Sequence, residues 1–207
     1  MSEKRKEEAK KLSEEIMKEL KDLDMPKVTF YVSFTKKEDE NGEALFSKDG
    51  YDKVEFLLSA NPGESLKPLS KIASGGELSR IMLALKSIFS DFDKAETLIF
   101  DEIDTGVSGR AAQKIAEKMC ALASKKQVLS ITHLAQLASM ADFQYLIEKN
   151  TEGERTETTV SLLNDEERVE EIARITSGAY ITDVSLMSAK EMLVLAEKIK
   201  GEIRGEK

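Results

Sequence analysis

Residues 98–109 read Leu-Ile-Phe-Asp-Glu-Ile-Asp-Thr-Gly-Val-Ser-Gly, and this stretch decides the fold. A short apolar strand, expected over 97–100, ends in two adjacent carboxylates, Asp101 and Glu102. In an open parallel sheet, ligands gather beyond the carboxyl ends of the strands, so these acids are expected at a functional edge. A strand that ends in two solvated acids is the plain alternative. Asp104 and the two glycines after it favour a tight loop beside the acids.

The segments on either side alternate between helix and strand. A helix is expected over 74–89, before the apolar strand, and another over 108–124, after it. A second apolar strand over 128–131 follows, and a short helix comes after His133. This order predicts two parallel strands joined by a crossover helix. His133, the only histidine, then lies at the same end of the sheet as Asp101, either as a functional group or as a structural histidine.

Hydrophobic periodicity and turn residues predict the remaining elements. Two alternating strands near the N-terminus suggest an antiparallel pair at an edge of the fold, and a later pair suggests a hairpin around Gly153. These elements are a helix over 2–24, strands over 28–34 and 54–58, a largely irregular loop over 59–73, hairpin strands over 143–148 and 156–163, a helix that opens near Asn164, and a last helix over 183–199.

The first helix carries a narrow apolar seam in a field of Lys and Glu. Its apolar positions recur at steps of three and four: Ala9, Leu12, Ile16, Leu20 and Leu23. A seam of this width is typical of a coiled coil, and an ordinary amphipathic surface helix is the alternative. We predict a coiled-coil stub over 1–25 and a single larger domain over 26–207.

Composition narrows the functional classes. The chain has 207 residues, of which 41% are hydrophobic and 34% charged, as in a soluble globular protein. The formal net charge of -8 argues against a general polyanion-binding surface. Cys120 is the only cysteine, so a reducing compartment and a role as a small core residue are expected. No apolar run reaches membrane-spanning length, and we expect a cytoplasmic protein without a membrane partner.

The helix over 74–89 opens with Ser74-Gly75-Gly76-Glu77. Ser74 is a good N-cap, and Glu77 can complete a capping box. The glycines are less ordinary, because each costs about 1 kcal/mol relative to Ala within a helix. They leave backbone N–H groups open to an anion at the positive end of the helix. A tight, closely packed turn is the alternative reason for the pair.

The order of these motifs along the chain strongly resembles that of the ABC-type ATPases, and within them the SMC-like heads. In that family the Ser-Gly-Gly segment is the signature motif, the apolar strand with its acids is Walker B, the next aspartate starts the D-loop, and the histidine is the switch residue. Glu77 in place of glutamine points to chromosome-maintenance and repair members. Runs over 71–80, 101–109 and 131–136 are similar to those of a bacterial DNA-repair member.

The resemblance implies a fold and a set of roles. The fold is the C-terminal lobe of an ATPase head, an α/β lobe with a parallel core sheet flanked by helices and with antiparallel edge strands. Ser74, Gly75, Gly76 and Glu77 would bind ATP held by an opposite head. Asp101 would support Mg²⁺ through water, Glu102 would be the general base, His133 would contact the γ-phosphate, and Asp104 would couple the two sites.

One part of the family pattern is missing. None of the eleven glycines is followed by Lys, so the Walker A pattern G-x-x-x-x-G-K-[ST] does not occur. We therefore expect a C-terminal fragment that is inactive alone. Its expected partners are an N-terminal Walker A lobe, a second head bound through ATP, and DNA in the whole protein, which would be a nucleoid-associated factor in double-strand-break repair.

Three other interpretations remain. The chain could be a non-enzymatic binding or dimerisation module, or a head fragment of another SMC-like or Rad50-like ATPase. A nucleic-acid-binding module is the third, and the acidic balance argues against it. Partner binding that needs no nucleotide would favour the first of these.

Overall fold

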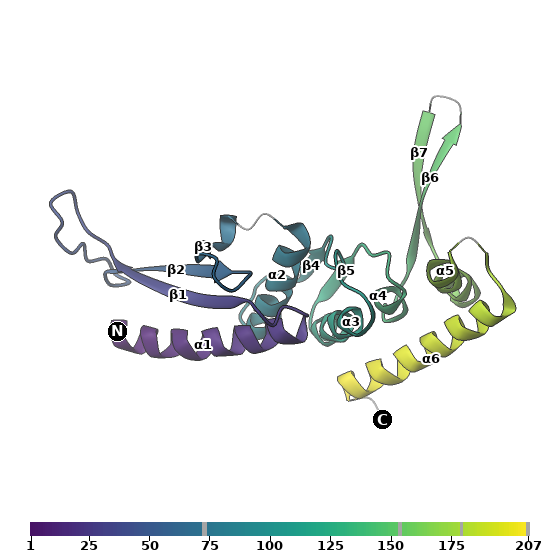
Figure 1. Ribbon diagram of the computed structural model, residues 1–207, viewed down its shortest axis with the longest axis horizontal. Coiled ribbons are helices and arrows are strands. Elements are labelled where there is room, and N and C mark those ends of the chain that lie inside the picture. The colour runs from purple at the N-terminus through teal and green to yellow at the C-terminus, as the bar shows by residue number, and fades with distance from the viewer. Residues whose placement is uncertain (72–73, 153–154, 179, 206–207) are drawn as a thin grey trace. The chain divides into compact units, whose positions relative to one another are not determined.

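The computed structural model describes residues 1–71, 74–152, 155–178 and 180–205 (Figure 1). Contacts divide the chain into two compact units. The first consists of Met1–Ala95 together with Asp101–Thr105, and the second of Glu96–Phe100 together with Gly106–Lys207. The acidic turn after the first core strand therefore belongs to the same unit as the segment that begins at Ser74.

The first unit combines two helices with a small antiparallel sheet. Its elements are α1 (Ser2–Asp22), β1 (Thr29–Lys36), β2 (Asp52–Ser59), β3 (Lys67–Pro68), the 3-10 helix η1 (Leu69–Lys71) and α2 (Gly75–Phe89). β1 and β2 pair over their whole length, from Thr29 opposite Ser59 to Lys36 opposite Asp52, which confirms the predicted antiparallel pair. The predicted loop over 59–73 contains β3, whose Pro68 lies opposite Leu57 at the edge of this sheet.

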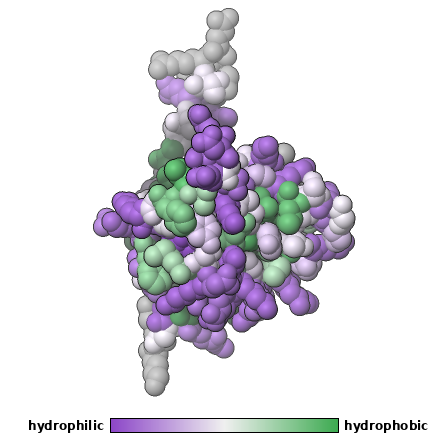
Figure 2. Space-filling view, turned by 90° about the vertical axis from the view of Figure 1, so that its left-hand side faces the viewer, coloured by the Kyte–Doolittle hydropathy of each residue, from purple (hydrophilic) through white to green (hydrophobic). Residues whose placement is uncertain are grey.

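The second half of α1 belongs to the core of this unit. Ile16 and Leu20 of α1 and Leu23, which follows the helix, are fully buried, and α1 contacts both β1 and α2. Elsewhere along α1, the helix, the sheet and the end of α2 leave an open groove of about 770 Å³ with an apolar lining that includes Leu12 and Phe34. Figure 2 shows hydrophobic residues exposed among hydrophilic ones on the face that it presents. The division into a stub over 1–25 and a domain over 26–207 stays a prediction.

The second unit contains the predicted parallel strands. β4 (Thr97–Phe100) and β5 (Gln127–Ser130) pair in parallel, with Thr97 opposite Gln127 and Phe100 opposite Ser130. Helix α3 (Gly109–Ala123) is the crossover between them, as expected. One face of β4 is buried through Leu98 and Phe100, which are 7% and 4% exposed. The other face exposes Ile99 opposite Leu129, so this two-stranded sheet is covered on one side only.

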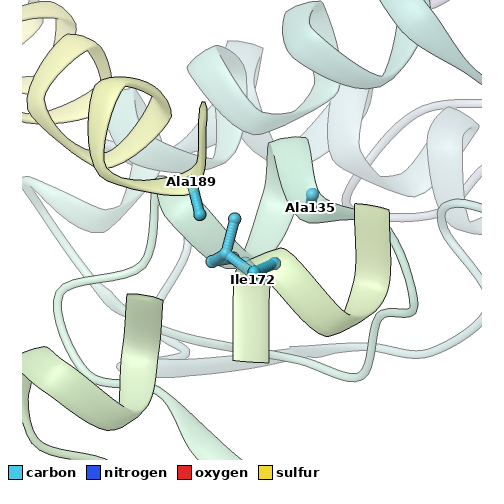
Figure 3. Packing of buried hydrophobic residues seen from close by; sticks show 5 residues of the cluster. Ala135, Ile172 and Ala189 are labelled. Atoms are coloured by element: carbon cyan, nitrogen blue, oxygen red, sulfur yellow. The ribbon is translucent and has the colours of Figure 1, made fainter. Parts of the chain in front are cut away.

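Three helices complete this unit: α4 (Ala135–Ser139), α5 (Asp165–Ser177) and α6 (Asp183–Arg204). Ile172 of α5 is fully buried and packs with Ala135 of α4 and Ala189 of α6 (Figure 3). The alanines allow close approach of the helices, because they add little bulk at the contact. α5 begins with a complete capping box between Asn164 and Glu167.

A β-hairpin extends beyond the helices of the second unit (Figure 1). Its strands are β6 (Tyr145–Glu152) and β7 (Arg155–Leu162), which pair from Tyr145 opposite Leu162 to Glu152 opposite Arg155. The hairpin was expected from the sequence, and its predicted turn residue, Gly153, lies outside the described residues.

The α/β architecture predicted from the sequence is confirmed, and its main difference is the length of the last helix. α6 ends at Arg204 rather than at residue 199. The helix continues through residues 200–204 until Gly205, which adopts the left-handed conformation (φ 71°) that favours glycine. Among the described helices, none combines the length and apolar character needed to cross a membrane.

Candidate functional site

The N-terminal end of α2 carries the predicted signature residues. Ser74 is the N-cap in extended conformation, and its Oγ accepts a hydrogen bond of 3.4 Å from the Glu77 N–H. Among the described residues, the Ser74 N–H makes no return hydrogen bond to the Glu77 carboxylate, so half of the predicted capping box is present. Ser74 and Gly75 are exposed, which leaves this end of the helix open to solvent.

The predicted acidic residues form a tight turn over 101–105. The Glu102 N–H donates to Asp101 Oδ1 at 2.9 Å, and the Thr105 N–H donates to the Glu102 carbonyl at 3.0 Å. Glu102 has a φ of 57°, a left-handed conformation that costs a non-glycine residue roughly 1–3 kcal/mol. Asp101 and Glu102 are exposed, whereas Asp104 is buried. The turn therefore separates two exposed acids from one that is part of the interior.

The two glycines of α2 lie directly against this turn. A Cβ added to Gly75 would lie 1.9 Å from Glu102 Oε2, so the missing side chain makes room for the carboxylate. A Cβ on Gly76 would lie 3.0 Å from both the Glu102 carbonyl oxygen and Thr105 Cβ. The two glycines therefore allow close packing against the turn, which was the alternative reason for the pair. This packing still leaves room for an anion to bind at the exposed helix end, because Gly75 remains accessible there.

Two residues of α2 that sequence reasoning missed bind the acidic turn. Ser79 Oγ donates to the Asp101 carbonyl at 2.6 Å. Arg80 Nη1 donates to the Thr105 carbonyl at 2.9 Å and to the Ile103 carbonyl at 3.4 Å. A signal for Arg80 was available in the helical spacing. Residues three and four positions further along, Leu83 and Ala84, are core residues, so Arg80 lies on the apolar face of α2.

Arg80 is buried, with 8% of its surface exposed. Burial lowers the pKa of its guanidinium from the ordinary value, and the nearby carboxylate of Glu77 opposes this change. An arginine remains charged under these conditions, because its ordinary pKa lies far above neutral pH. The buried guanidinium therefore places a positive charge beside the backbone of the acidic turn.

His133 belongs to the second unit. It follows β5 and precedes α4, as predicted, and its side chain is exposed. The hydroxyl of the preceding Thr132 accepts a hydrogen bond of 3.0 Å from the Leu134 N–H, which shapes the connection into the helix. The structure thus groups the signature residues with Asp101, Glu102 and Asp104 in one unit, and places His133 with β5 and α4 in the other.

The side chains of the turn could supply part of the ligands of a metal ion, but not all of them. They suit a metal ion that also binds water and phosphate oxygens. Among the described residues, no cluster of three or more His, Cys, Asp or Glu side chains could hold a metal. Asp101 is an exposed carboxylate with one oxygen engaged by a backbone N–H of its own turn. Mg²⁺ commonly keeps several waters and takes one or two carboxylates together with phosphate oxygens, so Asp101 fits a supporting role.

The chain is similar in sequence to DNA repair proteins named RecN. It is 52% identical over 196 residues to the DNA repair protein RecN of Halalkalibacterium halodurans and 49% identical over 205 residues to that of Bacillus subtilis. Each match covers 95% of this chain but 34% and 36% of the relatives, so the chain spans about a third of their length.

The structural comparison agrees with the expected fold. The chain is similar to a crystal structure of the Smc head domain with a coiled coil and joint from Pyrococcus yayanosii, with a TM-score of 0.52 and 19% identity. The match covers 83% of this chain and 30% of that chain. No protein-family model matches the chain.

Proposed function

Because the chain is related to the RecN proteins over almost its whole length, we propose that it forms the lobe of an ATP-hydrolysing head that carries the signature and the acidic residues, within a protein of DNA repair. The observation that supports this most strongly is the packing of Gly75 and Gly76 against the turn that bears Glu102. An exposed helix end for an anion and an exposed carboxylate are thereby held in one unit.

In this proposal several residues of the chain have separate roles in phosphoryl transfer. Such transfer depends mainly on positioning and on stabilisation of charge. The exposed end of α2 at Ser74 and Gly75 binds the γ-phosphate of ATP held by a second head. Glu102 takes the proton from the attacking water, and Asp101 supports Mg²⁺, which supplies charge stabilisation when bound. His133 contacts the γ-phosphate from the second unit, and the buried Asp104 couples the two nucleotide sites.

The proposal also assigns partners. A separate lobe with a Walker A loop supplies the β-phosphate cradle, which this chain lacks. A second head joins through shared ATP, and DNA is bound by the whole protein in the nucleoid of a bacterial cytoplasm. Because each nucleotide needs groups from two heads, hydrolysis is conditional on their association, and the isolated chain is inactive.

The test is ATP hydrolysis by this chain alone, by a matching Walker A lobe alone and by the two mixed. We expect steady turnover only in the mixture and its loss in Glu102→Gln, which keeps the size of the side chain but removes the base. Glu191→Gln, which changes an exposed carboxylate on α6, is the matched control and should retain turnover. Turnover by the isolated chain would contradict the proposal. Association of the lobes without turnover would leave a binding module.

A further inference from the structure

Side chains of α2 bind three of the five carbonyls of the acidic turn over 101–105. The Asp101 carbonyl accepts from Ser79 Oγ at 2.6 Å, and the Ile103 and Thr105 carbonyls accept from Arg80 Nη1 at 3.4 and 2.9 Å. The Glu102 carbonyl is satisfied within the turn by the Thr105 N–H. Two consecutive residues of one helix thus determine the path of the segment that carries all three predicted acids.

The chemistry of this contact favours an arginine over a lysine. One terminal nitrogen reaches two carbonyls two residues apart, and the charge strengthens both hydrogen bonds. A lysine carries a compact ammonium on a flexible stem, so it would hold the two carbonyls less rigidly than a planar guanidinium does. A buried lysine also loses its charge more readily than an arginine.

The contact matters because the turn is held in an unfavourable conformation. Glu102 keeps a left-handed backbone, which persists only where the surroundings determine it. Arg80 bonds the carbonyls on both sides of Asp104, one of which lies directly after Glu102 in the chain. Loss of these bonds would allow the turn to relax and would move the Glu102 carboxylate from its place beside Gly75.

We propose that Arg80 is a positioning residue for ATP hydrolysis. It fixes the turn over 101–105 to α2, so that the general base Glu102 and the anion-binding end of the helix keep one geometry. This inference rests on the proposed function, because Glu102 is a base only if the head hydrolyses ATP. Arg80 itself is buried and acts through the backbone of the turn.

The experiment compares Arg80→Lys with wild type in the head reassembled from this chain and the Walker A lobe. We expect kcat to fall about 10- to 100-fold, the scale of a misplaced catalytic group, with KM for ATP changed less than about threefold. Arg168→Lys is the matched control. Its side chain also donates from a helix to a main-chain carbonyl, that of Ala141 at 2.9 Å, and its loss should leave kcat unchanged.

A double variant separates positioning from general destabilisation. In a single-turnover measurement of the residual hydrolysis by Glu102→Gln, adding Arg80→Lys should cause little further loss, because both changes remove the same contribution. The inference is overturned if Arg80→Lys keeps kcat within twofold of wild type, or if Arg168→Lys lowers kcat equally. It is also overturned if the rate losses of Arg80→Lys and Glu102→Gln multiply in the double variant.

A second measurement distinguishes failure of this inference from failure of the proposed function. If the wild-type mixture hydrolyses no ATP, the proposed function fails, and hydrogen exchange in the isolated chain then tests the contact alone. We expect amides over 101–105 to exchange at least tenfold faster in Arg80→Lys and at the wild-type rate in Arg168→Lys. Equal exchange in all three proteins overturns the inference.

Discussion

Gly75 and Gly76 are adjacent in sequence, yet a side chain at each would meet different surroundings. At Gly75 the obstacle is the Glu102 carboxylate, the mobile end of a side chain. At Gly76 it is the backbone of Glu102 and Thr105 together with Thr105 Cβ. A side chain can turn aside, whereas the backbone of a tight turn yields only with a rearrangement of its hydrogen bonds.

The first prediction follows from this difference. Gly76→Ala should lower the free energy of unfolding by about 1–3 kcal/mol, the usual cost of overpacking. Gly75→Ala should leave it within about 1 kcal/mol of wild type, since alanine is the better helix former. Urea unfolding measures both. Gly75→Ala should still reduce ATP turnover in the reassembled head, because the new methyl group displaces Glu102. Equal stability losses in the two variants would contradict this account.

The second prediction concerns Cys120. This residue is 4% exposed within α3, and burial raises the pKa of its thiol above the ordinary value. Since the thiolate is the reactive form, the folded chain should react with a disulfide reagent far more slowly than the urea-unfolded chain. Labelling followed by mass spectrometry measures both rates. Rapid labelling of the folded chain would show that α3 is not packed as described.

For individual residues, the sequence predicted where the acids and the signature residues lie, but not the hydrogen bonds that fix their positions. Asp101, Glu102 and Asp104 could be placed because an apolar strand precedes them. The bonds from Ser79 and Arg80 end on main-chain carbonyls, and every residue carries a carbonyl, so the acceptors have no signature in the sequence. His133 was placed correctly after β5, and its predicted role awaits the hydrolysis experiment.

The ends of the helices differ in how they are capped. Asn164 Oδ1 accepts hydrogen bonds of 3.0 Å from the N–H groups of Glu166 and Glu167 at the start of α5. Ser108, the N-cap of α3, makes no side-chain cap bond. The two positions therefore form a natural pair in which the same substitution should have unequal effects.

The third prediction uses this pair. Asn164→Ala should lower the free energy of unfolding by about 1 kcal/mol, the typical value of a lost N-cap. Ser108→Ala should change it by less than about 0.5 kcal/mol, because no cap bond is lost. Thermal or urea unfolding followed by circular dichroism provides both values. A larger loss in Ser108→Ala than in Asn164→Ala would contradict the assignment of the caps.

Ion pairs join the end of α6 to the segment after α4. Arg204 Nη2 donates to both carboxylate oxygens of Asp142, at 2.9 and 2.7 Å, and Lys200 Nζ lies 3.3 Å from one of them. The hydrogen bond from Arg204 is the main cause that lowers the pKa of Asp142 below its ordinary 3.8, with Lys200 adding to it against the effect of burial.

The fourth prediction is a pH dependence. Because the folded pKa is lowered, the stabilisation from Asp142 is complete above about pH 5 and is lost as the pH falls through 3.8 toward the folded pKa. Asp142→Asn should cost about 1 kcal/mol at pH 7, a modest value because the carboxylate is partly exposed. The difference from wild type should shrink by pH 3 in urea titrations. Asp49→Asn, in an exposed turn, should show neither effect.

Most elements could be predicted, because periodicity and turn residues mark them. The parallel strands and their crossover helix follow from apolar runs at the right spacing. The end of α6 could not be predicted in this way. Its last turns carry Lys200 and Arg204, whose burial and ion pairs depend on Asp142, a residue far away in the sequence. The prediction ended the helix at residue 199, whereas the structure shows ion pairs with Asp142 in its last turns.

On the scale of the whole molecule, apolar side chains remain uncovered on the parallel strands. Ile99, Leu129 and Ile131 are 70%, 45% and 56% exposed. Ile99 lies directly opposite Leu129, so these side chains share one face of the two-stranded sheet. Contiguous exposed apolar surface of this kind favours association in water. A Walker A lobe would offer such a face a partner, in line with the proposed function.

The fifth prediction tests that face. Sedimentation velocity should show association of the isolated chain that increases with concentration, and Ile99→Glu should weaken it by placing a charge on the face. Val194→Glu is the control, because Val194 is equally exposed, at 71%, but lies on α6. A chain that stays monomeric at high concentration, or a control that acts like Ile99→Glu, would contradict the role of this face.

The burial of the single cysteine has a practical consequence for spectroscopy. With Cys120 protected, thiols introduced at Glu55 on β2 and Glu191 on α6 would be the sites that accept fluorophores. One dye would then be carried by each of the two units. Energy transfer between the dyes would then measure the distance between the two labelled sites, without prior removal of a native thiol.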